Sequence, residues 1–392
     1  IRSGGHPKAS RELIPSIGLM TETNYNYVDG KWVAAGTGET FSVHNPADRS
    51  DVVGEFQKSG TTDAEAAVEA ADEASQVWAE THGPERGRIL RAAGQNLADR
   101  KDELTETLVR EEGKARPEAA GEVQRAIDIF AYYAAKASDL GGTVKASSSD
   151  NTRLYTVNEP VGVAGLITPW NYPIAIPAWK IAPALATGNT IVFKPASQAP
   201  GVSRKLVECL DEAELPDGVL NYVTGPGSEV GKTFSTHEAV DAVSFTGSSA
   251  VGDTVGRQAN ETGKRVQLEM GGKNPTVVMP SADVDEAVDI AVSGAFGVTG
   301  QACTATSRAI VHEDVYDEFV EGAVAAADAV EIGPGLDGAE MGPQVSESEL
   351  DSTLEYVDIG VGEGATLETG GDEVAAGDGF FIKPAVFSNV DP

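Results

Sequence analysis

Residues 161–178 have the sequence VGVAGLITPWNYPIAIPA, and this stretch decides the fold. It is long enough to be mistaken for a membrane span, but Pro169, Pro173 and Pro177 interrupt it and Lys180 follows. Prolines at this spacing would repeatedly break a helix that had to cross a bilayer. We therefore expect a buried strand, a sharp turn and a following helix, and no association with a membrane.

The chain from 161 to 269 continues this alternation. Short apolar runs such as TIVF, GVLNYV, AVSF and RVQLE alternate with longer amphipathic segments. Strands separated by helical segments predict a parallel sheet with crossover helices. After Glu269 the pattern restarts at PTVVM, so we predict two consecutive α/β units that meet near residue 270. Ligands of such folds bind beyond the carboxyl ends of the strands.

The chain before residue 161 is organised differently. Residues 61–140 predict four helices, the first with Thr62 and Glu65 as a capping box. Residues 151–158, NTRLYTVN, alternate like an edge strand or half of a hairpin. Residues 1–19 are basic and lack the apolar centre of a secretory signal, so we expect a disordered leader before a natural start at Met20.

The composition excludes several classes of protein. The 392 residues include 61 acidic and 29 basic side chains, and the acids recur in every helical stretch. This charge argues against a nucleic-acid partner, and no acid cluster has metal-ligand spacing, so no metal is expected. A surface adapted to high salt explains the acidity better than a basic partner does. The two cysteines cannot build a disulfide framework, which predicts a cytoplasmic protein.

Glycines mark candidate phosphate-binding turns. FTGSSAVG, residues 245–252, places Gly247 and Gly252 between a strand and a helix, and TGPGSEVG, residues 224–231, also follows a strand. Backbone amides at such a turn can bind a pyrophosphate, although neither segment is a G-x-G-x-x-G motif and an ordinary βα turn is the alternative. Lys194 in FKPAS ends a strand, where it could reach a ribose or a phosphate.

Three further side chains have the chemistry of a catalytic site. Asn171 lies in the rigid turn TPWNYP and can donate an N–H to an oxyanion. Glu269 stands between a strand and Gly271–Gly272, where it is either a general base or a capping carboxylate. Cys303 lies in TGQACTATSR, which we expect to be a loop at the start of a helix-like run, where backbone amides lower its pKa. Cys209, on a helix, is expected to be buried and inert.

The order TPWNYP, FKPAS, FTGSSAVG, LEMGGK, GQACTA closely resembles the aldehyde dehydrogenase superfamily, from about Asn24 to the last residue. The resemblance implies an α/β fold with a Rossmann-type nucleotide-binding domain over 20–140 and 160–270 and an α/β catalytic domain over 271–392. It also implies a small β extension over 141–159 that joins subunits into a homo-oligomer, either a dimer or a tetramer.

The resemblance implies roles for single residues as well. Cys303 matches the nucleophile, Glu269 the general base, and Asn171 the oxyanion donor together with the Cys303 amide. Lys180 matches a lysine near the base that takes part in proton relay. The residues expected beside the cofactor are Trp170, Lys194, Ser197, Gly227, Gly247, Ser248, Gly252 and Met270.

The implied reaction is oxidation of a small aldehyde to a carboxylic acid, through a thiohemiacetal and a thioester on Cys303, with NAD or NADP as cofactor. Glu269 favours hydrolysis of the thioester over transfer to coenzyme A. Relatives restricted to NAD often have a glutamate at the position of Ser197, and a carboxylate there would repel a 2′-phosphate, so we expect NADP to be accepted and favoured.

Several segments, including GQACTATSR and NPADRSDVVGEF, look most like those of 2,5-dioxovalerate (α-ketoglutaric semialdehyde) dehydrogenases of pentose degradation. Succinate semialdehyde and glyceraldehyde-type substrates are alternatives. The chain ends at FIKPAVFSNVDP, before the family's EEIFGP-like segment and final strand, so an incomplete catalytic domain with uncovered apolar surface is expected.

Two rival functions follow from the residues alone. One is a nucleotide-binding protein without catalysis. The other is a cysteine hydrolase, which requires a partner histidine. No histidine has flanking residues that suggest this role; the five are His6, His44, His82, His237 and His312.

Overall fold

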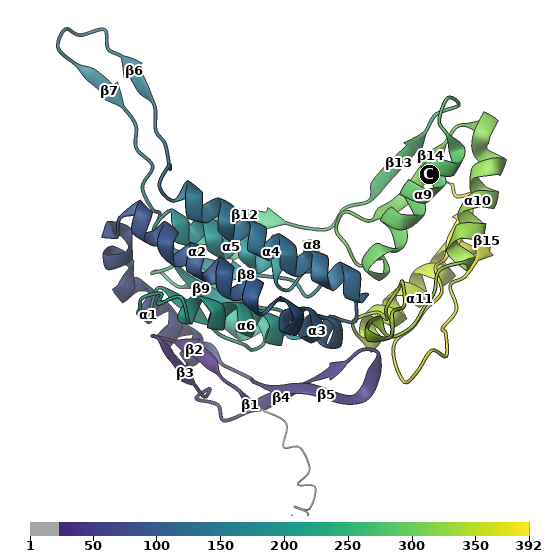
Figure 1. Ribbon diagram of the computed structural model, residues 1–392, viewed down its shortest axis with the longest axis horizontal. Coiled ribbons are helices and arrows are strands. Elements are labelled where there is room, and N and C mark those ends of the chain that lie inside the picture. Colours follow the sequence, from purple (N-terminus) through teal and green to yellow (C-terminus); the bar gives the residue numbers. More distant parts are fainter. Residues whose placement is uncertain (1–22, 392) are drawn as a thin grey trace, which may run out of the picture.

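The structure is a computed structural model that describes residues 23–391, so the expected leader, residues 1–19, lies outside the described residues. Its central sheet has seven strands: β2 (Asn26–Val28), β3 (Lys31–Val33), β8 (Val163–Ile167), β9 (Thr190–Lys194), β10 (Leu220–Tyr222), β11 (Ala242–Thr246) and β12 (Arg265–Glu269). Their order is β12-β11-β8-β9-β10-β2-β3. Strands β8 to β12 pair in parallel, which confirms the predicted sheet, and β2 and β3 add an antiparallel edge (Figure 1).

The strand order reverses between β8 and β11. From β8 the chain builds the sheet outward through β9 and β10, then returns to the other side of β8 to add β11 and β12. Ile167 is in register with Lys194 and with Phe245, and Thr246 is in register with Glu269, so the carboxyl ends of four strands lie at one edge. Such a reversal creates a crevice where ligands bind in open α/β sheets.

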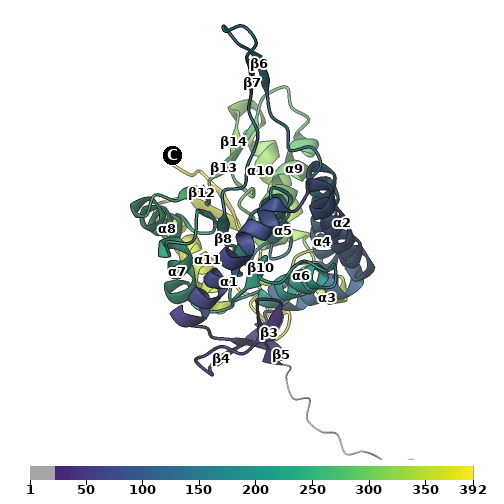
Figure 2. The same ribbon diagram turned by 90° about the vertical axis from the view of Figure 1, so that its left-hand side faces the viewer.

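Helices cover both faces of the sheet (Figure 2). One face is covered by α1 (Thr61–Glu80), the π-helical turn η1 (Gly227–Gly231), α7 (Lys232–Thr236) and α8 (Ser249–Glu261). The other is covered by α5 (Ala175–Ala186) and α6 (Pro200–Asp211), with α2 (Gly83–Asp99), α3 (Lys101–Glu112) and α4 (Arg116–Lys136) outside them. Because both faces are covered, β8 and β9 are buried at every residue and show no polar alternation.

The expected four helices between 61 and 140 are confirmed, but the expected capping box is wrong. Helix α1 begins at Thr61, and the residue before it, Gly60, is the N-cap. The carboxylate of Asp63, not that of Glu65, accepts the Gly60 N–H at 2.9 Å and the Gly36 N–H at 2.7 Å. The helix therefore begins two residues earlier than the local motif predicts, and the same Asp63 carboxylate also contacts a distant turn.

The stretch that resembled a membrane span forms the predicted strand, turn and helix. Pro177 does not break α5, because it lies in the first turn, where a backbone N–H has no partner within the helix. Across residues 23–391, none of the helices combines the length and the apolar character needed to span a bilayer.

The C-terminal lobe is a smaller α/β unit. Its strands are the parallel pair β13 (Asn274–Val278) and β14 (Thr306–Val311) and the antiparallel pair β15 (Thr366–Thr369) and β16 (Val386–Ser388). Its helices are α9 (Val284–Phe296), η2 (Gly297–Gly300), η3 (Glu313–Val315), α10 (Tyr316–Asp328), η4 (Gly335–Asp337) and α11 (Glu347–Gly362). Val278 and Phe319 belong to its core, whereas Val277 is 60% and Ile310 53% exposed on the two parallel strands.

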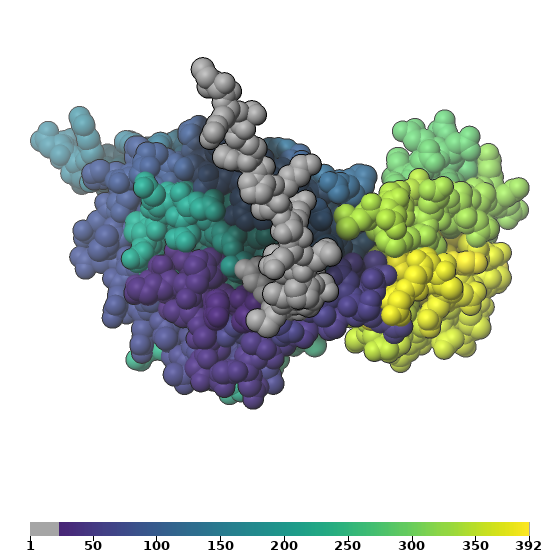
Figure 3. Space-filling view, turned by 60° about the horizontal axis from the view of Figure 1, so that its bottom comes forward, coloured from purple at the N-terminus to yellow at the C-terminus, as the bar shows by residue number. Residues whose placement is uncertain are grey.

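A second sheet connects the two lobes. It consists of β1 (Thr23–Asn24), β4 (Thr40–Asn45) and β5 (Asp48–Gln57), and the β4–β5 hairpin reaches the C-terminal lobe (Figure 3). Arg49 N–H donates to the Asp378 carbonyl at 2.9 Å, and Phe380 N–H donates to the Pro46 carbonyl at 3.0 Å. Strands β6 (Val144–Ala146) and β7 (Arg153–Tyr155) form a separate hairpin that projects from the body (Figure 1).

Candidate functional site

One cavity lies where the two lobes meet. Its volume is about 600 Å³, and its walls come from the segments after β8, β11 and β12 and from the loop after η2. The sheet edge with the strand reversal therefore faces residues of the C-terminal lobe. Seven of the residues selected from the sequence line this cavity: Trp170, Asn171, Gly247, Ser248, Glu269, Met270 and Cys303.

The Cys303 side chain is exposed to the cavity, but its expected local structure is wrong. Cys303 does not begin a helix-like run. It lies in a turn between the short helix η2 and strand β14 and not at the N-terminus of a helix. Residues 304–307, TATS, are β-branched or small, and the chain continues into the parallel pairing with β13 instead.

The loop before Cys303 has a constrained backbone. Val298 and Thr299 both adopt left-handed conformations, with φ of 53° and 56°, which β-branched residues rarely adopt. The surrounding structure holds them, because Thr299 Oγ1 donates to the Gly342 carbonyl at 3.1 Å. Asn274 Nδ2 donates to the carbonyl of Cys303 itself at 2.8 Å. Partners distant in sequence therefore determine where the thiol lies.

Asn171 reaches the same loop from the other lobe. Its Nδ2 donates to the Gln301 carbonyl at 2.6 Å, and its Oδ1 is buried without a hydrogen-bond partner among the described residues. A carboxamide has two N–H groups, and Gln301 uses one of them. The arrangement leaves the second N–H for a group that enters the cavity beside Cys303.

Glu269 is connected to the buried Lys180 by a chain of hydrogen bonds. Lys180 Nζ donates to Ser244 Oγ at 2.6 Å, and Ser244 Oγ donates to Gln267 Oε1 at 2.6 Å. Gln267 Nε2 lies 3.4 Å from Glu269 Oε1. Burial lowers the pKa of Lys180 to about 8, and the charge of Glu269 partly opposes this shift. Because the Gln267 amide nitrogen only donates to Glu269, the chain orients the carboxylate relative to Lys180 and does not relay a proton.

Ser244 and Gln267 were not among the residues expected at the site. A signal was available, because Gln267 stands two residues before Glu269 on β12, and alternate residues of a strand share a face. Apart from Cys303 and Gly271, residues that the C-terminal lobe contributes to the cavity were not expected either. These include Gln344, Glu349, Thr353 and Lys383.

The start of α8 is suited to an anion. Ser248 is the N-cap, but its side chain makes no capping hydrogen bond, and the first turn contains no acidic residue. Backbone N–H groups at such an end attract phosphate. Gly252, one turn later, does not line the cavity. A Cβ at Gly252 would lie 2.5 Å from the Met270 sulfur, so the glycine lets Met270 pack against α8.

Three other selected residues lie on the same edge of the sheet but outside the cavity. Lys194 ends β9, is buried, and donates from Nζ to the Pro195 carbonyl at 3.0 Å. Burial lowers its pKa to about 8. Ser197 is exposed in the loop after β9, and Gly227 begins η1 after β10 with open space beside its Cα.

The arrangement is suited to nucleophilic attack on a carbonyl group. A thiol, a carboxamide N–H and a carboxylate line one cavity, next to a helix end that can hold phosphate. Among the described residues that line the cavity there is no histidine, which disfavours the cysteine-hydrolase interpretation. Within residues 23–391, no group of three or more His, Cys, Asp or Glu side chains could hold a metal ion.

Comparison with known proteins agrees with this chemistry. Residues 32–392 match the family model described as the aldehyde dehydrogenase family. The chain is 64% identical to the alpha-ketoglutarate semialdehyde dehydrogenase of Haloferax volcanii, over 95% of this chain and 78% of the relative. It is 43% identical to the alpha-ketoglutaric semialdehyde dehydrogenase of Bacillus subtilis, again over 95% of this chain and 78% of the relative.

Solved structures have the same fold. Betaine aldehyde dehydrogenase from Staphylococcus aureus, in complex with NAD⁺, superposes with a TM-score of 0.91 at 34% identity, over 94% of this chain and 74% of that one. A 3,6-anhydro-L-galactose dehydrogenase, in complex with NADP, superposes with a TM-score of 0.91 at 36% identity, over 94% of this chain and 78% of that one.

Proposed function

The chain belongs to the aldehyde dehydrogenase family, and on that premise we propose that it oxidises 2,5-dioxovalerate to 2-oxoglutarate. The aldehyde carbon gains an oxygen from water, and the hydride passes to NAD(P)⁺. The observation that carries the proposal is the meeting of Cys303, Asn171 and Glu269 in one cavity, together with the 64% identity to the enzyme of Haloferax volcanii.

We assign one chemical step to each of the three side chains. The Cys303 thiolate attacks the aldehyde carbon and forms a hemithioacetal. The second N–H of Asn171 and the Cys303 amide stabilise the negative charge on the former carbonyl oxygen. After hydride loss leaves a thioester on Cys303, Glu269 takes a proton from the water that attacks it. Ser244 and Gln267 link the Glu269 carboxylate to Lys180 and orient it, and Glu269, whose side chain is exposed, releases the proton to solvent.

The residues present fit a dinucleotide. The N-terminus of α8, with Gly247, Ser248 and Gly252, would hold the pyrophosphate, and Trp170 and Met270 would flank the nicotinamide end. Lys194, Ser197 and Gly227, at the ends of the next two strands, would hold the adenosine end. NAD(P)⁺, when bound, supplies the hydride acceptor. Ser197 has no charge to repel a 2′-phosphate, which supports use of NADP in preference to NAD.

The substrate class has support from the cavity. Lys383 is the positively charged residue among the described residues that line it. A 2-oxo acid semialdehyde carries a carboxylate, which a lysine can pair with. We therefore propose that Lys383 favours anionic aldehydes over neutral ones.

We further propose the domain division given above: nucleotide-binding domain 20–140 and 160–270, hairpin 141–159, and catalytic domain 271–392. Val144 and Tyr155 on the hairpin are 82% and 71% exposed, which supports an interface between subunits of a homo-oligomer. Both cysteines are free, as expected of a protein of the reducing cytoplasm.

The test is steady-state kinetics of aldehyde-dependent cofactor reduction. The protein is assayed with 2,5-dioxovalerate, succinate semialdehyde and a neutral aldehyde, each with NADP and with NAD. We expect the highest kcat/KM for 2,5-dioxovalerate with NADP. In Lys383→Met the KM for 2,5-dioxovalerate should rise by about tenfold, as expected for loss of one charge-assisted contact, and the KM for the neutral aldehyde should not change.

The control is Cys303→Ala, which should abolish turnover but retain cofactor binding. Turnover that persists in this variant contradicts the proposed chemistry. Cofactor binding by the parent without turnover of any aldehyde would instead support a nucleotide-binding protein without catalysis.

A further inference from the structure

A buried ion pair lies beneath the turn that carries Asn171. Lys114, between α3 and α4, is 1% exposed, and its Nζ lies 2.7 Å from Glu122 Oε2 and 3.7 Å from Glu112 Oε2. Burial opposes the charge on Lys114, but the two glutamates outweigh it, so its pKa lies above its ordinary value. Burying an ion pair rarely stabilises a fold more than apolar residues would, so its presence calls for another explanation.

The ion pair holds both ends of that turn. Lys114 Nζ donates to the Asn171 carbonyl at 2.7 Å. At the other end, Glu122 Oε1 accepts the backbone N–H groups of Ile174 and Ala175, each at 3.0 Å. The lysine also lies 4.4 Å from the centroid of the Tyr172 ring, between these two ends. The backbone from 171 to 175 is therefore fixed by side chains from one neighbouring segment.

The same segment also holds the loop that leads to Cys303. Glu118, in the first turn of α4, accepts the Val298 N–H at 2.7 Å through Oε1. Val298 is one of the two left-handed residues before the thiol. The segment from Lys114 to Glu122 thus contacts both walls of the cavity, one through Lys114 and Glu122 and the other through Glu118.

We propose that Lys114 and Glu122 are positioning residues, which hold the Asn171 backbone so that its carboxamide points at the carbonyl oxygen of a substrate on Cys303. Asn171 Oδ1 has no partner among the described residues, so the direction of the carboxamide depends on the backbone and on the bond to Gln301. Donors fixed before the reaction stabilise a developing oxyanion most effectively. The catalytic part of this inference rests on the proposed function.

A comparison within the molecule separates this role from simple helix support. Glu111, at the end of α3, is also buried and accepts the Gly201 and Val202 N–H groups at the start of α6. Among the described residues it forms no ion pair with a lysine, and burial raises its pKa to about 7, which the charge of Lys205 opposes only in part. A carboxylate alone therefore suffices to hold a helix N-terminus. What Lys114 adds is the bond to the Asn171 carbonyl.

The test uses the double variant Lys114→Met/Glu122→Gln, which removes both charges of the pair together. Burial already raises the pKa of Glu112 to about 8, so this carboxyl stays protonated at neutral pH once Lys114 is gone. The carboxamide oxygen introduced at position 122 can still accept from Ile174 and Ala175. The matched control is Glu111→Gln. Glu111 is a buried glutamate that binds the start of α6, and it does not line the cavity.

Two measurements are made on each protein. The first is the side-chain carboxamide NMR signal of Asn171, assigned by its loss in Asn171→Ala. The second is the rate of the first hydride transfer at saturating cofactor, followed in the pre-steady state. In the double variant we expect a broadened or averaged carboxamide signal and a hydride-transfer rate lower by about 10- to 100-fold, the usual effect of misplaced catalytic groups. Cofactor affinity should change by less than about twofold, since the pair does not touch the expected nucleotide residues.

An unchanged carboxamide signal and hydride-transfer rate in the double variant would overturn the proposal. Equal losses in Glu111→Gln would overturn it as well, because they would indicate a general effect of structure. If the double variant does not fold, the same Asn171 carboxamide signal is measured in the single variant Lys114→Met. If the parent oxidises no aldehyde, the proposed function fails, and the carboxamide signal still decides whether the ion pair positions Asn171.

Discussion

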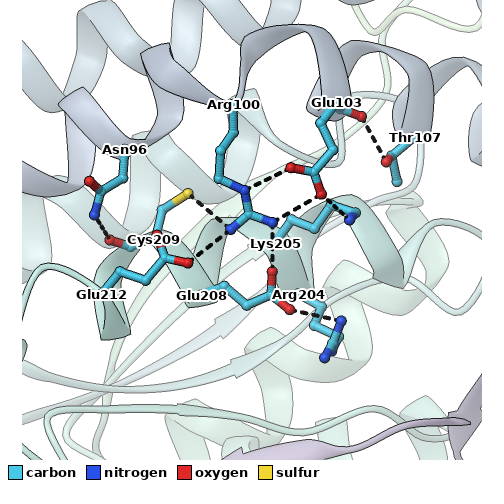
Figure 4. Close-up of polar contacts among 9 residues, drawn as sticks. All are labelled: Asn96, Arg100, Glu103, Thr107, Arg204, Lys205, Glu208, Cys209 and Glu212. Atoms are coloured by element: carbon cyan, nitrogen blue, oxygen red, sulfur yellow. Dashed lines mark hydrogen bonds and ion pairs between the residues drawn. The ribbon is translucent and has the colours of Figure 1, made fainter. Parts of the chain in front are cut away.

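The two cysteines of this chain have opposite surroundings. Cys209 is fully buried on α6, where its carbonyl accepts from Asn96 Nδ2 at 3.0 Å and its sulfur lies 3.9 Å from an Arg100 nitrogen (Figure 4). Cys303 is exposed in a turn at the mouth of the cavity between the lobes. One thiol is enclosed by its own helix and its neighbours, and the other faces space that a ligand can enter.

The environment of Cys209 suppresses its reactivity. Burial raises the pKa of Cys209 to about 12, and the nearby Arg100 only partly opposes this. Arg100 is already committed to acidic partners, since it forms ion pairs with Glu103, Glu208 and Glu212 (Figure 4). Burial therefore accounts for the expected inertness of Cys209, whereas Cys303, the proposed nucleophile, is exposed and is positioned by partners from distant segments.

The largest expected contrast is in alkylation of the native protein. With a pKa of about 12, only about one Cys209 side chain in 10⁴ is a thiolate at pH 8, and none is accessible. Iodoacetamide should therefore modify Cys303 at least about 10³-fold faster than Cys209, measured by mass spectrometry of the peptides. In urea the two rates should converge. Comparable rates in the folded protein would contradict the assignment of roles.

The next effect concerns the carboxylates beside each cysteine. Glu269→Gln removes the expected base, so hydrolysis of the thioester should slow by about 10²- to 10⁴-fold while the first hydride transfer persists. Pre-steady-state kinetics would show a burst of reduced cofactor followed by slow turnover. The control is Glu208→Gln, beside Cys209 and Arg100, which should leave turnover unchanged. Loss of the burst in Glu269→Gln would place this residue before hydride transfer instead.

The third effect is on stability, and here the larger loss is expected for the variant of Cys209, not for the variant of Cys303. Cys209→Ser places a hydroxyl in a buried site built for a thiol, so the free energy of unfolding should fall by about 1–3 kcal/mol. Cys303→Ser is exposed and should change it by less than about 0.5 kcal/mol. Urea denaturation followed by circular dichroism measures both. Equal losses would mean that Cys303 also contributes to the core.

The smallest effect is a pH dependence. Because the pKa of Cys209 rises on folding from its ordinary value of 9.0 to about 12, the folded state retains a proton that the unfolded state releases. The contribution of Cys209 to stability is thus complete below pH 9 and decreases as the pH rises toward 12. Over pH 8 to about 10.5 the stability of Cys209→Ala should decrease less steeply than that of the parent. Parallel curves would contradict the raised pKa.

Much of the fold could be predicted because its signals are local. Apolar runs such as VGVAGLI and TIVF are strands whose burial on both faces removes any polar alternation, and the helices between them show their own periodicity. Strands β1 to β5, helix α11 and the β15–β16 pair went without prediction. Their segments are short or mixed in pattern, and they are stabilised by contacts such as that of Arg49 with Asp378.

The candidate site, like the fold, could be predicted only in part from the sequence. The residue types in TPWNYP, LEMGGK and GQACTA were sufficient to select Asn171, Glu269 and Cys303. Their meeting in one cavity depends on the strand reversal between β8 and β11 and on the second lobe, which no local pattern specifies.

The sequence by itself determined which side chains are available and which of the strongly patterned segments become strands or helices, since propensity and periodicity act over a few residues. Only the tertiary structure decided that Cys303 follows a strained turn and not a helix start, that Ser244 and Gln267 join Lys180 to Glu269, and that Lys114 holds the Asn171 carbonyl. These contacts join residues far apart in the chain, and their geometry is set by sheet order, register and packing.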